Sequence, residues 1–205
     1  MENSLTDQEI EKFNRLYDHA YALVAQLIIL DNQNEVKKLG FFARLKIKRC
    51  IKLLEKALTI YPDSWQSMLM TDKAHQRLGH TEHAISWLEK AHAQSPENNR
   101  LAKEIGMRAT QLGKPTLAID CLSDLAKRHT KDAEVHISLG CAYLLCQDLQ
   151  PAKEAFNQAL LVEPTNPNHE KLVALVNYVI AGKIPCPTSH EEIFNHTQPP
   201  QIKEK

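Results

Sequence analysis

The sequence repeats with a period of 34 residues, and this period constrains the fold more than any other feature. One column of the repeat holds small residues and another holds large apolar ones: Ala84, Ala118 and Ala152, then Leu88, Leu122 and Phe156. A fixed period of this length is typical of a solenoid, in which each unit buries its apolar face only by stacking on its neighbours. The sequence therefore predicts stacked repeats.

Helix-capping and turn residues recur with the same period. The last column of each unit holds a residue that is favourable as a helix N-cap: Ser64, Asn98, Asp132 and Asn166. Inside the units, Gly79 and Gly113 share a column in which a helix is expected to end in a tight turn. Each unit is therefore predicted to be a helix, a turn, a second helix and a short connection to the next cap.

The composition favours helices over sheet. Apolar residues make up 43% of the chain and glycines number only six, while runs of alternating Val, Ile and Thr are missing. Five cysteines without a C-x-x-C pair suit a reducing compartment, so a cytoplasmic location is predicted. The acidic, polar start is unlike a signal peptide, and the longest apolar stretch, 22–30, is too short to cross a bilayer.

Residues 133–166 resemble the tetratricopeptide repeat (TPR) family. The resemblance rests on the following residues: Leu139, Gly140, Tyr143, Ala152, Phe156, Ala159 and Pro164. It implies antiparallel helix pairs stacked into a right-handed superhelix, with the small columns lying where helices approach most closely. The column in which the family usually has tryptophan holds His136 here.

The expected fold is an all-α, TPR-type right-handed α-solenoid. Its expected parts are an N-terminal hairpin or modified first repeat (1–64), three repeats (65–98, 99–132 and 133–166), a capping helix (167–182) and a flexible tail (183–205). In the alternative interpretation of the tail, Ile184, Ile193 and Phe194 dock back onto the solenoid. The 65–98 unit departs from the family pattern, because Thr71, Asp72 and His75 replace the usual Leu, Gly and Tyr.

The resemblance also implies a partner-binding groove, because the first helix of each unit lines the concave surface of a TPR stack. The candidate groove residues are Gln66, Met70, Lys73, Arg77, Arg100, Lys103, Met107, Thr110, Gln111, Glu134 and Ser138. The four cations among them, beside two methionines, suit a peptide with carboxylates and apolar anchors. The alternative is an ordinary solvated groove, with Glu104 neutralising part of the charge. The carboxylate clamp of chaperone-binding family members is not reproduced, because Glu104 and Glu134 would repel a carboxylate.

The charge of the chain is zero in total but uneven along it. Residues 37–56 hold eight bases and one acid, whereas residues 1–36 hold seven acids and two bases. One interpretation is that this basic helix binds nucleic acid or an anionic membrane. The favoured one is a solvated face that the acidic N-terminal helix partly neutralises. Phe41 and Phe42 are expected in the core, because they continue an apolar stripe.

No catalytic or cofactor motif is present. The sequence has no Gly-rich phosphate loop, no H-E-x-x-H and no G-x-S-x-G. His80 and His83 lie three apart in a turn, but no third or fourth metal ligand follows at a recognised spacing. The sequence therefore predicts no catalytic residues, no cofactor-binding residues and no metal ligands.

These observations favour a non-catalytic scaffold or adaptor that binds a segment of another protein in its groove. A homodimer is possible, while nucleic acid and membranes are not the expected partners. The alternatives are a binding module that uses the basic 37–56 helix, and a secretion or assembly chaperone of TPR architecture.

Overall fold

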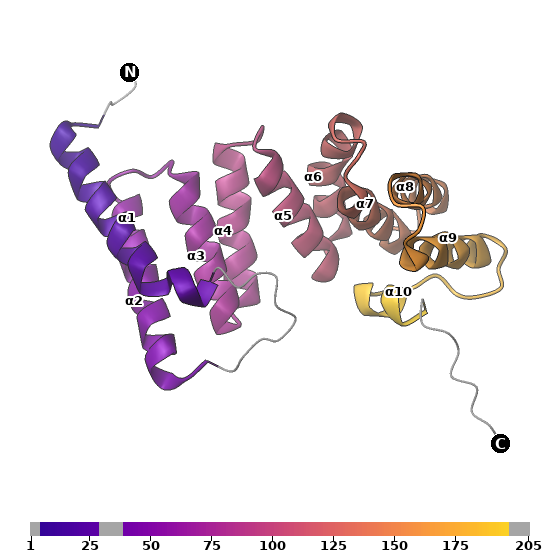
Figure 1. Cartoon of the computed structure of the whole chain (residues 1–205), viewed down its shortest axis with the longest axis horizontal. Helices are drawn as coiled ribbons and strands as arrows, with labels where there is room; N and C mark the ends of the chain where they lie inside the picture. The colour runs from indigo at the N-terminus through magenta and orange to yellow at the C-terminus, as the bar shows by residue number, and fades with distance from the viewer. Residues whose placement is uncertain (1–4, 29–38, 197–205) are drawn as a thin grey trace. The chain divides into compact units, whose positions relative to one another are not determined.

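The computed structural model describes residues 5–28 and 39–196, and these residues form helices and no strands. The chain divides into two compact units, which are residues 1–96 (unit 1) and 97–205 (unit 2). Figure 1 colours both units from the N-terminus in indigo to the C-terminus in yellow. The fold is the all-α, TPR-type stack of helix pairs that the period predicts.

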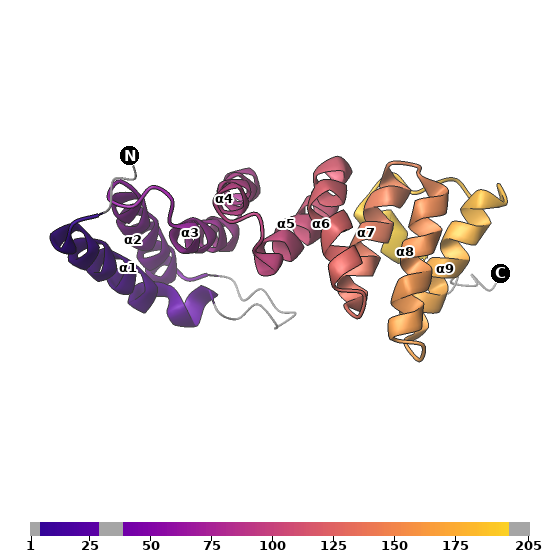
Figure 2. The same cartoon turned by 90° about the horizontal axis from the view of Figure 1, so that it is seen from above.

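Unit 1 is built from two helix hairpins. Its helices are α1 (Asp7–Ile28), α2 (Phe41–Leu58), α3 (Trp65–Leu78) and α4 (Thr81–Gln94). Consecutive helices pack on one another, and α1 also contacts α3 (Figure 2). The core of this unit forms where Val24 of α1, Ile47 and Leu54 of α2 and Ala74 of α3 meet, all at most 1% exposed.

Unit 2 holds six helices. They are α5 (Asn99–Gln111), α6 (Pro115–Arg128), α7 (Ala133–Leu145), α8 (Leu149–Val162), α9 (Pro167–Ile180) and α10 (His190–His196). The helices from α5 to α9 pack consecutively, and α5 also packs on α7, as neighbouring first helices do in a repeat stack. The short α10 contacts α5, α7 and α9.

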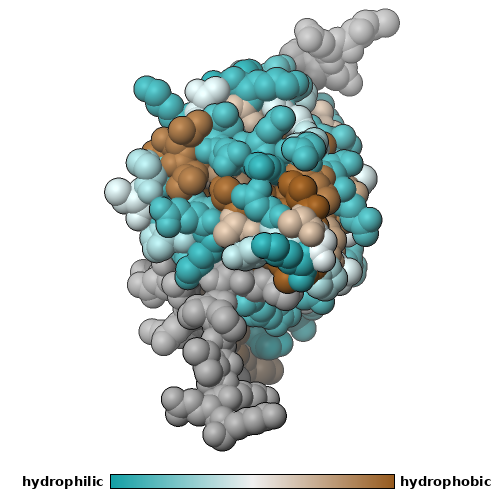
Figure 3. Space-filling model, turned by 90° about the vertical axis from the view of Figure 1, so that its right-hand side faces the viewer, coloured by the Kyte–Doolittle hydropathy of each residue, from teal (hydrophilic) through white to brown (hydrophobic). Residues whose placement is uncertain are grey.

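The helix α9 ends the stack with a largely polar outer face. Glu170 and Lys171 are exposed on it, while Leu172, Leu175 and Val176 are buried against α7 and α8. Figure 3 looks onto this end of unit 2, where hydrophilic side chains surround scattered apolar ones. A terminal repeat needs such a polar face because nothing stacks on it.

The structure confirms the four predicted N-caps. The Ser64 hydroxyl accepts a hydrogen bond from Ser67 N at 3.3 Å, and the Asp132 carboxylate accepts one from Val135 N at 3.3 Å. Asn98 and Asn166 accept in the same way at the starts of α5 and α9. Each cap satisfies a backbone N–H that has no partner within the helix, which sets where the first helix of each unit begins.

The residue at the turn position has a left-handed backbone conformation in three successive repeats. Gly79 has φ +82°, Gly113 has φ +68°, and Gln147 occupies the same column with φ +63°. The residue after each closes the turn with a backbone hydrogen bond to the carbonyl five positions earlier, as in His80 N to His75 O at 3.0 Å. Gln147 therefore adopts a conformation that glycine tolerates and a side chain disfavours.

The small columns mark close approaches, as the sequence predicts. A Cβ added to Gly140 of α7 would lie 2.6 Å from the Phe156 ring of α8. One added to Gly106 of α5 would overlap the Leu122 side chain of α6. Glycine in these columns lets a large side chain of the second helix lie directly on the backbone of the first.

The expectation that Phe41 and Phe42 lie in the core is wrong. Their side chains are 71% and 78% exposed. The apolar stripe that buries α2 begins one turn later, at Ile47, and continues through Cys50, Ile51 and Leu54. In the predicted N-terminal hairpin, the second helix is α2 (Phe41–Leu58), and residues 29–38 before it lie outside the described part of the chain.

Replacing Gly140 tests the close approach in unit 2. Gly140→Ala is expected to lower the free energy of unfolding by about 1–3 kcal/mol, because the added methyl group overpacks against Phe156. Urea denaturation followed by circular dichroism measures this change. Without the contact, the same substitution in a helix would stabilise by about 1 kcal/mol, so the sign of the change decides. In a Phe156→Leu background the added methyl group should cost less, giving a measurable coupling.

Replacing Gln147 tests the left-handed turn. Gln147→Gly is expected to raise the free energy of unfolding by roughly 0.5–1 kcal/mol, because glycine adopts φ +63° without steric cost. The reverse change in the preceding repeat, Gly113→Gln, should lower it by a similar amount. A Gln147→Gly protein less stable than the wild type in urea would contradict this account of the turn.

Candidate functional site

The segment after α9 folds back onto unit 2. Pro185 and Pro187 keep it out of helical conformation until Ser189, the residue before α10 (His190–His196). Ser189 Oγ accepts a hydrogen bond from Glu192 N at 3.2 Å, and Glu192 Oε2 accepts one from Thr188 N at 2.7 Å. This arrangement resembles a capping box, except that Glu192 accepts from Thr188, the residue before the N-cap, and it marks the start of a helix only seven residues long.

Ile193 anchors α10 to the unit. Its side chain is 0% exposed and belongs to one apolar cluster with Cys141 and Leu144 of α7 and Leu172 and Leu175 of α9. We call the surface of α5, α7 and α9 that α10 contacts the inner face of unit 2. The inner face therefore has an apolar depression that accepts an aliphatic side chain.

The connection to α10 makes further contacts with the same surface. Cys186 Sγ donates a hydrogen bond to the Leu144 carbonyl oxygen at 3.3 Å, and Ile184 packs against the apolar cluster. Phe194 is 38% exposed, with its ring 4.8 Å from that of His190. The expected flexible tail is thus corrected for residues 184–194, which dock through Ile184 and Ile193. Residues 197–205 lie outside the described part of the chain.

Lys103, on α5, is already paired. Its Nζ lies 2.8 Å from Asp132 Oδ2 and 2.8 Å from Glu134 Oε2. Burial alone would lower the pKa of Lys103, but the hydrogen bonds to Asp132 and Glu134 raise it overall. Burial would likewise raise the pKa of Asp132, but the bond from Lys103 and the backbone N–H of Val135 lower it overall. Two carboxylates therefore neutralise the ammonium, which presents little net positive charge to a ligand.

Other predicted groove residues of unit 2 are engaged in packing. Arg108, just beside them, is 6% exposed and its Nη2 lies 2.6 Å from Glu104 Oε1. Thr110 is 1% exposed and its hydroxyl donates to the Gly106 carbonyl oxygen at 2.9 Å. Met107 and Ser138 are half-buried, while Arg100, Gln111 and Glu134 are exposed.

In unit 1, two predicted groove residues support the fold. Arg77 Nε donates to the Leu27 carbonyl oxygen at 3.2 Å, which satisfies a carbonyl in the last turn of α1. Met70 packs against the core of the unit, Lys73 is half-buried, and Gln66 is exposed. Lys73 and Arg77 belong to unit 1 whereas Arg100 and Lys103 belong to unit 2, so a joint cluster of the four cations stays a prediction.

The residues that the groove prediction left out are those of α9 and α10. The family pattern could not predict Leu172, Leu175 and Ile193, because it assigns inward-facing positions only within complete repeats. The four prolines of 183–205 favoured disorder. The available signal was the apolar residues Ile184, Ile193 and Phe194 in this segment, on which the alternative interpretation of the tail rested.

Three histidines gather at the turn between α3 and α4. The ring centroids of His75, His80 and His83 lie 5.6–6.2 Å apart, and Nδ1 of His75 is 3.4 Å from Nδ1 of His80. Burial, together with the charges of the other two rings, lowers the pKa of His75. Within residues 5–28 and 39–196, no group of three or more His, Cys, Asp or Glu is arranged to hold a metal ion.

Unit 2 also has a pocket between α6, α7 and α8. It measures about 900 Å³, and its lining includes His136, Leu139 and Tyr143 of α7. His136 Nε2 lies 3.1 Å from the Thr130 carbonyl oxygen, so the histidine in the usual tryptophan column links α7 to the preceding connection.

Among the described residues, no helix is both long and apolar enough to cross a membrane.

The stacked helix pairs, the periodic caps and an inner face that accepts a helix define a helical-repeat protein of the α-solenoid class. Residues 133–166 match the family model of the tetratricopeptide repeat. This match identifies one tetratricopeptide repeat in the chain, formed by α7 and α8. No curated protein sequence gives a significant match.

Solved structures of MamA have a similar fold. MamA AMB-1 is 20% identical with a TM-score of 0.61, and the match covers 92% of this chain and 87% of that chain. MamA from Desulfovibrio magneticus RS-1, from residue 41 to its end, is 14% identical with a TM-score of 0.65, covering 94% and 93%. Another MamA crystal structure is 17% identical with a TM-score of 0.66, covering 91% and 90%. At these identities the likeness extends to the fold alone.

Releasing α10 should expose cysteines of the inner face. Ile193→Asp cannot bury a carboxylate in an apolar cluster, so α10 should detach while the repeats stay folded. Cys141 is 1% exposed and burial raises the pKa of its thiol to about 12. We expect maleimide to label Cys141 and Cys186 at least about tenfold faster in the variant, as judged by mass spectrometry.

The same labelling experiment contains its controls. Cys50 lies in the core of unit 1 and should stay unlabelled in both proteins. Glu191→Gln, an exposed change on the same helix, should label like the wild type. Equal labelling of Cys141 and Cys186 in the wild type and in Ile193→Asp would mean that α10 does not cover the inner face in solution.

Proposed function

We propose that the chain is a non-catalytic interaction scaffold whose inner face holds a short amphipathic helix of a partner protein. The complete burial of Ile193 supports this most directly, because an aliphatic side chain of a short helix already packs on this surface. In this proposal α10 occupies the inner face until the partner's segment replaces it. An assembly chaperone of the same architecture would use the face in the same way and release the segment when α10 returns.

The size of α10 makes such an exchange energetically reasonable. Seven residues are too few for a stable isolated helix, so α10 keeps its form only while docked. Burying one isoleucine side chain contributes about 1.5–3 kcal/mol. A partner helix with two apolar anchors would exceed this contribution, so α10 can cover the face without closing it permanently.

Aliphatic contact, rather than charge, is proposed to provide most of the affinity. The cation of Lys103 is neutralised by Asp132 and Glu134, which leaves it unsuited to a partner's carboxylate. Arg100 is exposed and, among the described residues, its guanidinium makes no ion pair. Arg100 is therefore the cation best placed to orient an acidic partner segment, in the role first expected for the whole basic cluster.

A peptide supplied separately tests this use of the inner face. A labelled peptide of residues 183–196 should bind the full-length Ile193→Asp protein, because the variant has released its own α10. It should bind the wild type at least about tenfold more weakly, because the attached segment competes at a high effective concentration. Fluorescence anisotropy measures both affinities.

The peptide experiment also identifies partners. A peptide with Ile193→Asp should not bind, whereas one with Glu191→Gln should bind like the native sequence. Proteins that the Ile193→Asp chain captures, and that the native peptide displaces, are the candidate partners. If the peptide binds neither protein, or binds both equally, the inner face is not a helix-binding surface.

A further inference from the structure

The start of α2 exposes apolar side chains that would ordinarily be buried. Phe41 and Phe42 are 71% and 78% exposed, and Leu45 is 48% exposed. The two phenyl rings contact each other edge to face, with centroids 5.7 Å apart. Tyr21 of α1 is a further aromatic residue with 47% of its surface exposed. Neighbouring large apolar residues left exposed in this way often mark an interaction site.

Basic side chains continue the same face of α2. The helix buries Ile47, Cys50, Ile51, Leu54 and Ala57 against unit 1. A period of 3.6 residues places Phe41, Leu45, Lys48, Arg49, Lys52 and Lys56 on the opposite side, and all six are exposed. The outward face of α2 is thus apolar in its first turn and cationic along the rest of its length.

Within the described residues one acid, Glu55, lies on this face, beside Lys52 and Lys56 near the end of α2, and the turns before it carry none. From Phe41 to Leu54, and from Ala20 to Leu27 of α1, the sequence contains neither Asp nor Glu. Three of the four acids of α1, Asp7, Glu9 and Glu11, lie near its other end, since Phe13 there contacts Tyr61, beyond the last turn of α2. The fourth acid, Asp18, lies near the middle of α1. Across residues 5–28 and 39–196, the bases of α2 make no ion pair with α1. The described acids of α1 therefore make no direct ion pair with this face, and Glu2, Asp31 and Glu35 of the acidic N-terminal region lie outside the described residues.

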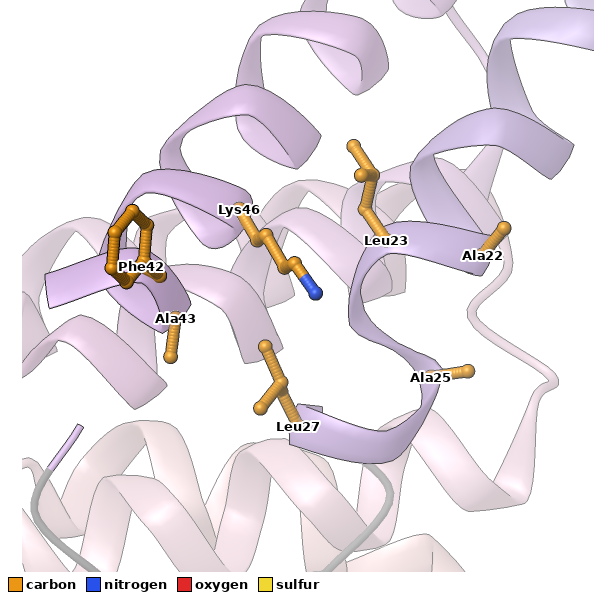
Figure 4. Close-up of a pocket in the computed structure, with 7 residues that line it drawn as sticks. All are labelled: Ala22, Leu23, Ala25, Leu27, Phe42, Ala43 and Lys46. Carbon is orange, nitrogen blue, oxygen red and sulfur yellow. The ribbon is translucent and has the colours of Figure 1, made fainter. Parts of the chain in front are cut away.

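A pocket lies beside the exposed aromatic residues. It measures about 380 Å³ and lies between the last turns of α1 and the first turns of α2, with apolar walls from Ala22, Leu23, Ala25, Leu27, Phe42 and Ala43. The remaining lining residue is Lys46, whose side chain extends between Leu23 and Leu27 (Figure 4). An ammonium group above apolar walls suits a ligand with a negative head and a hydrocarbon body.

We propose that this end of the α1–α2 hairpin binds the surface of an anionic phospholipid bilayer. Phe41, Phe42 and Leu45 enter the interface between headgroups and acyl chains, where aromatic side chains are favoured. Lys46, Lys48, Arg49 and Lys52 lie along the headgroups and contact their phosphates and carboxylates. The pocket receives part of one lipid, with its anionic group on Lys46.

A lipid surface fits this end of the hairpin better than a nucleic acid does. The pocket walls are aliphatic and phenyl groups, so they offer a base edge no hydrogen-bond partner besides Lys46. The edge-to-face arrangement of Phe41 and Phe42 gives no pair of parallel rings between which a base could stack. Both features suit hydrocarbon, which needs no hydrogen bonds.

Vesicle sedimentation with the full chain tests the proposal. The protein should bind vesicles of phosphatidylcholine mixed with phosphatidylserine, and should not bind vesicles of phosphatidylcholine alone. Phe41→Ser/Phe42→Ser should weaken binding at least about tenfold, and these side chains are exposed enough that the fold should not change. Changing Lys46, Lys48, Arg49 and Lys52 to Gln should weaken it as much and remove its dependence on salt.

A matched control separates the hairpin from general stickiness. Leu161→Ser removes a side chain that is 73% exposed on α8 of unit 2, and should leave vesicle binding unchanged. The proposal is overturned if the wild type ignores phosphatidylserine, or if the Phe41→Ser/Phe42→Ser protein binds as well as the wild type. A competition experiment gives a third outcome that overturns it. In that outcome a DNA or RNA oligonucleotide binds the hairpin and prevents vesicle binding at a lower concentration than soluble phosphoserine requires. That result would assign the basic face to nucleic acid.

Discussion

Direct contact between a glycine backbone in the first helix of a pair and a large side chain of the second is the interaction on which the repeats of unit 2 depend. Gly140 with Phe156, and Gly106 with Leu122, bring α7 onto α8 and α5 onto α6 at a separation that no side chain on the glycine would permit. Once each pair has formed, the caps at Asp132 and Asn166 determine where the next first helix starts. Close packing inside a pair and capping between pairs together place α5, α7 and α9 so that they share one inner face.

The inner face of unit 2 is mainly apolar in character because its charged side chains pair with one another. Lys103 forms ion pairs with Asp132 and Glu134, so its positive charge is compensated within the chain. Leu144, Leu172 and Leu175 form an apolar depression beside it, and Ile193 fills this depression. In the proposed function this surface would bind an amphipathic helix by shape and apolar contact, because the charges that would attract a partner over a distance are largely compensated within the chain.

The hairpin of unit 1 shows a different balance. Three of the four acids of α1 come early in that helix, and because α1 and α2 run antiparallel these acids lie beside the end of α2 rather than its start. The end with Phe42 and Lys46 is therefore left both apolar and cationic. The inner face of unit 2 and this end of unit 1 differ in chemistry, and for this reason we propose a helical segment for the first and an anionic interface for the second.

The sequence by itself determined the helical pairs, the caps and the turns, because these depend on residues close together in the chain and recur with one period. It also predicted the close approaches, since Gly140 leaves room that only Phe156 in a facing column can fill. Only the tertiary structure decided that Ile193 is buried, that Arg77 caps α1, that Lys103 is neutralised and that Phe41 and Phe42 are exposed. Each of these depends on which side chains from distant parts of the chain meet, and a local pattern of apolar and charged residues does not specify the partner across the contact.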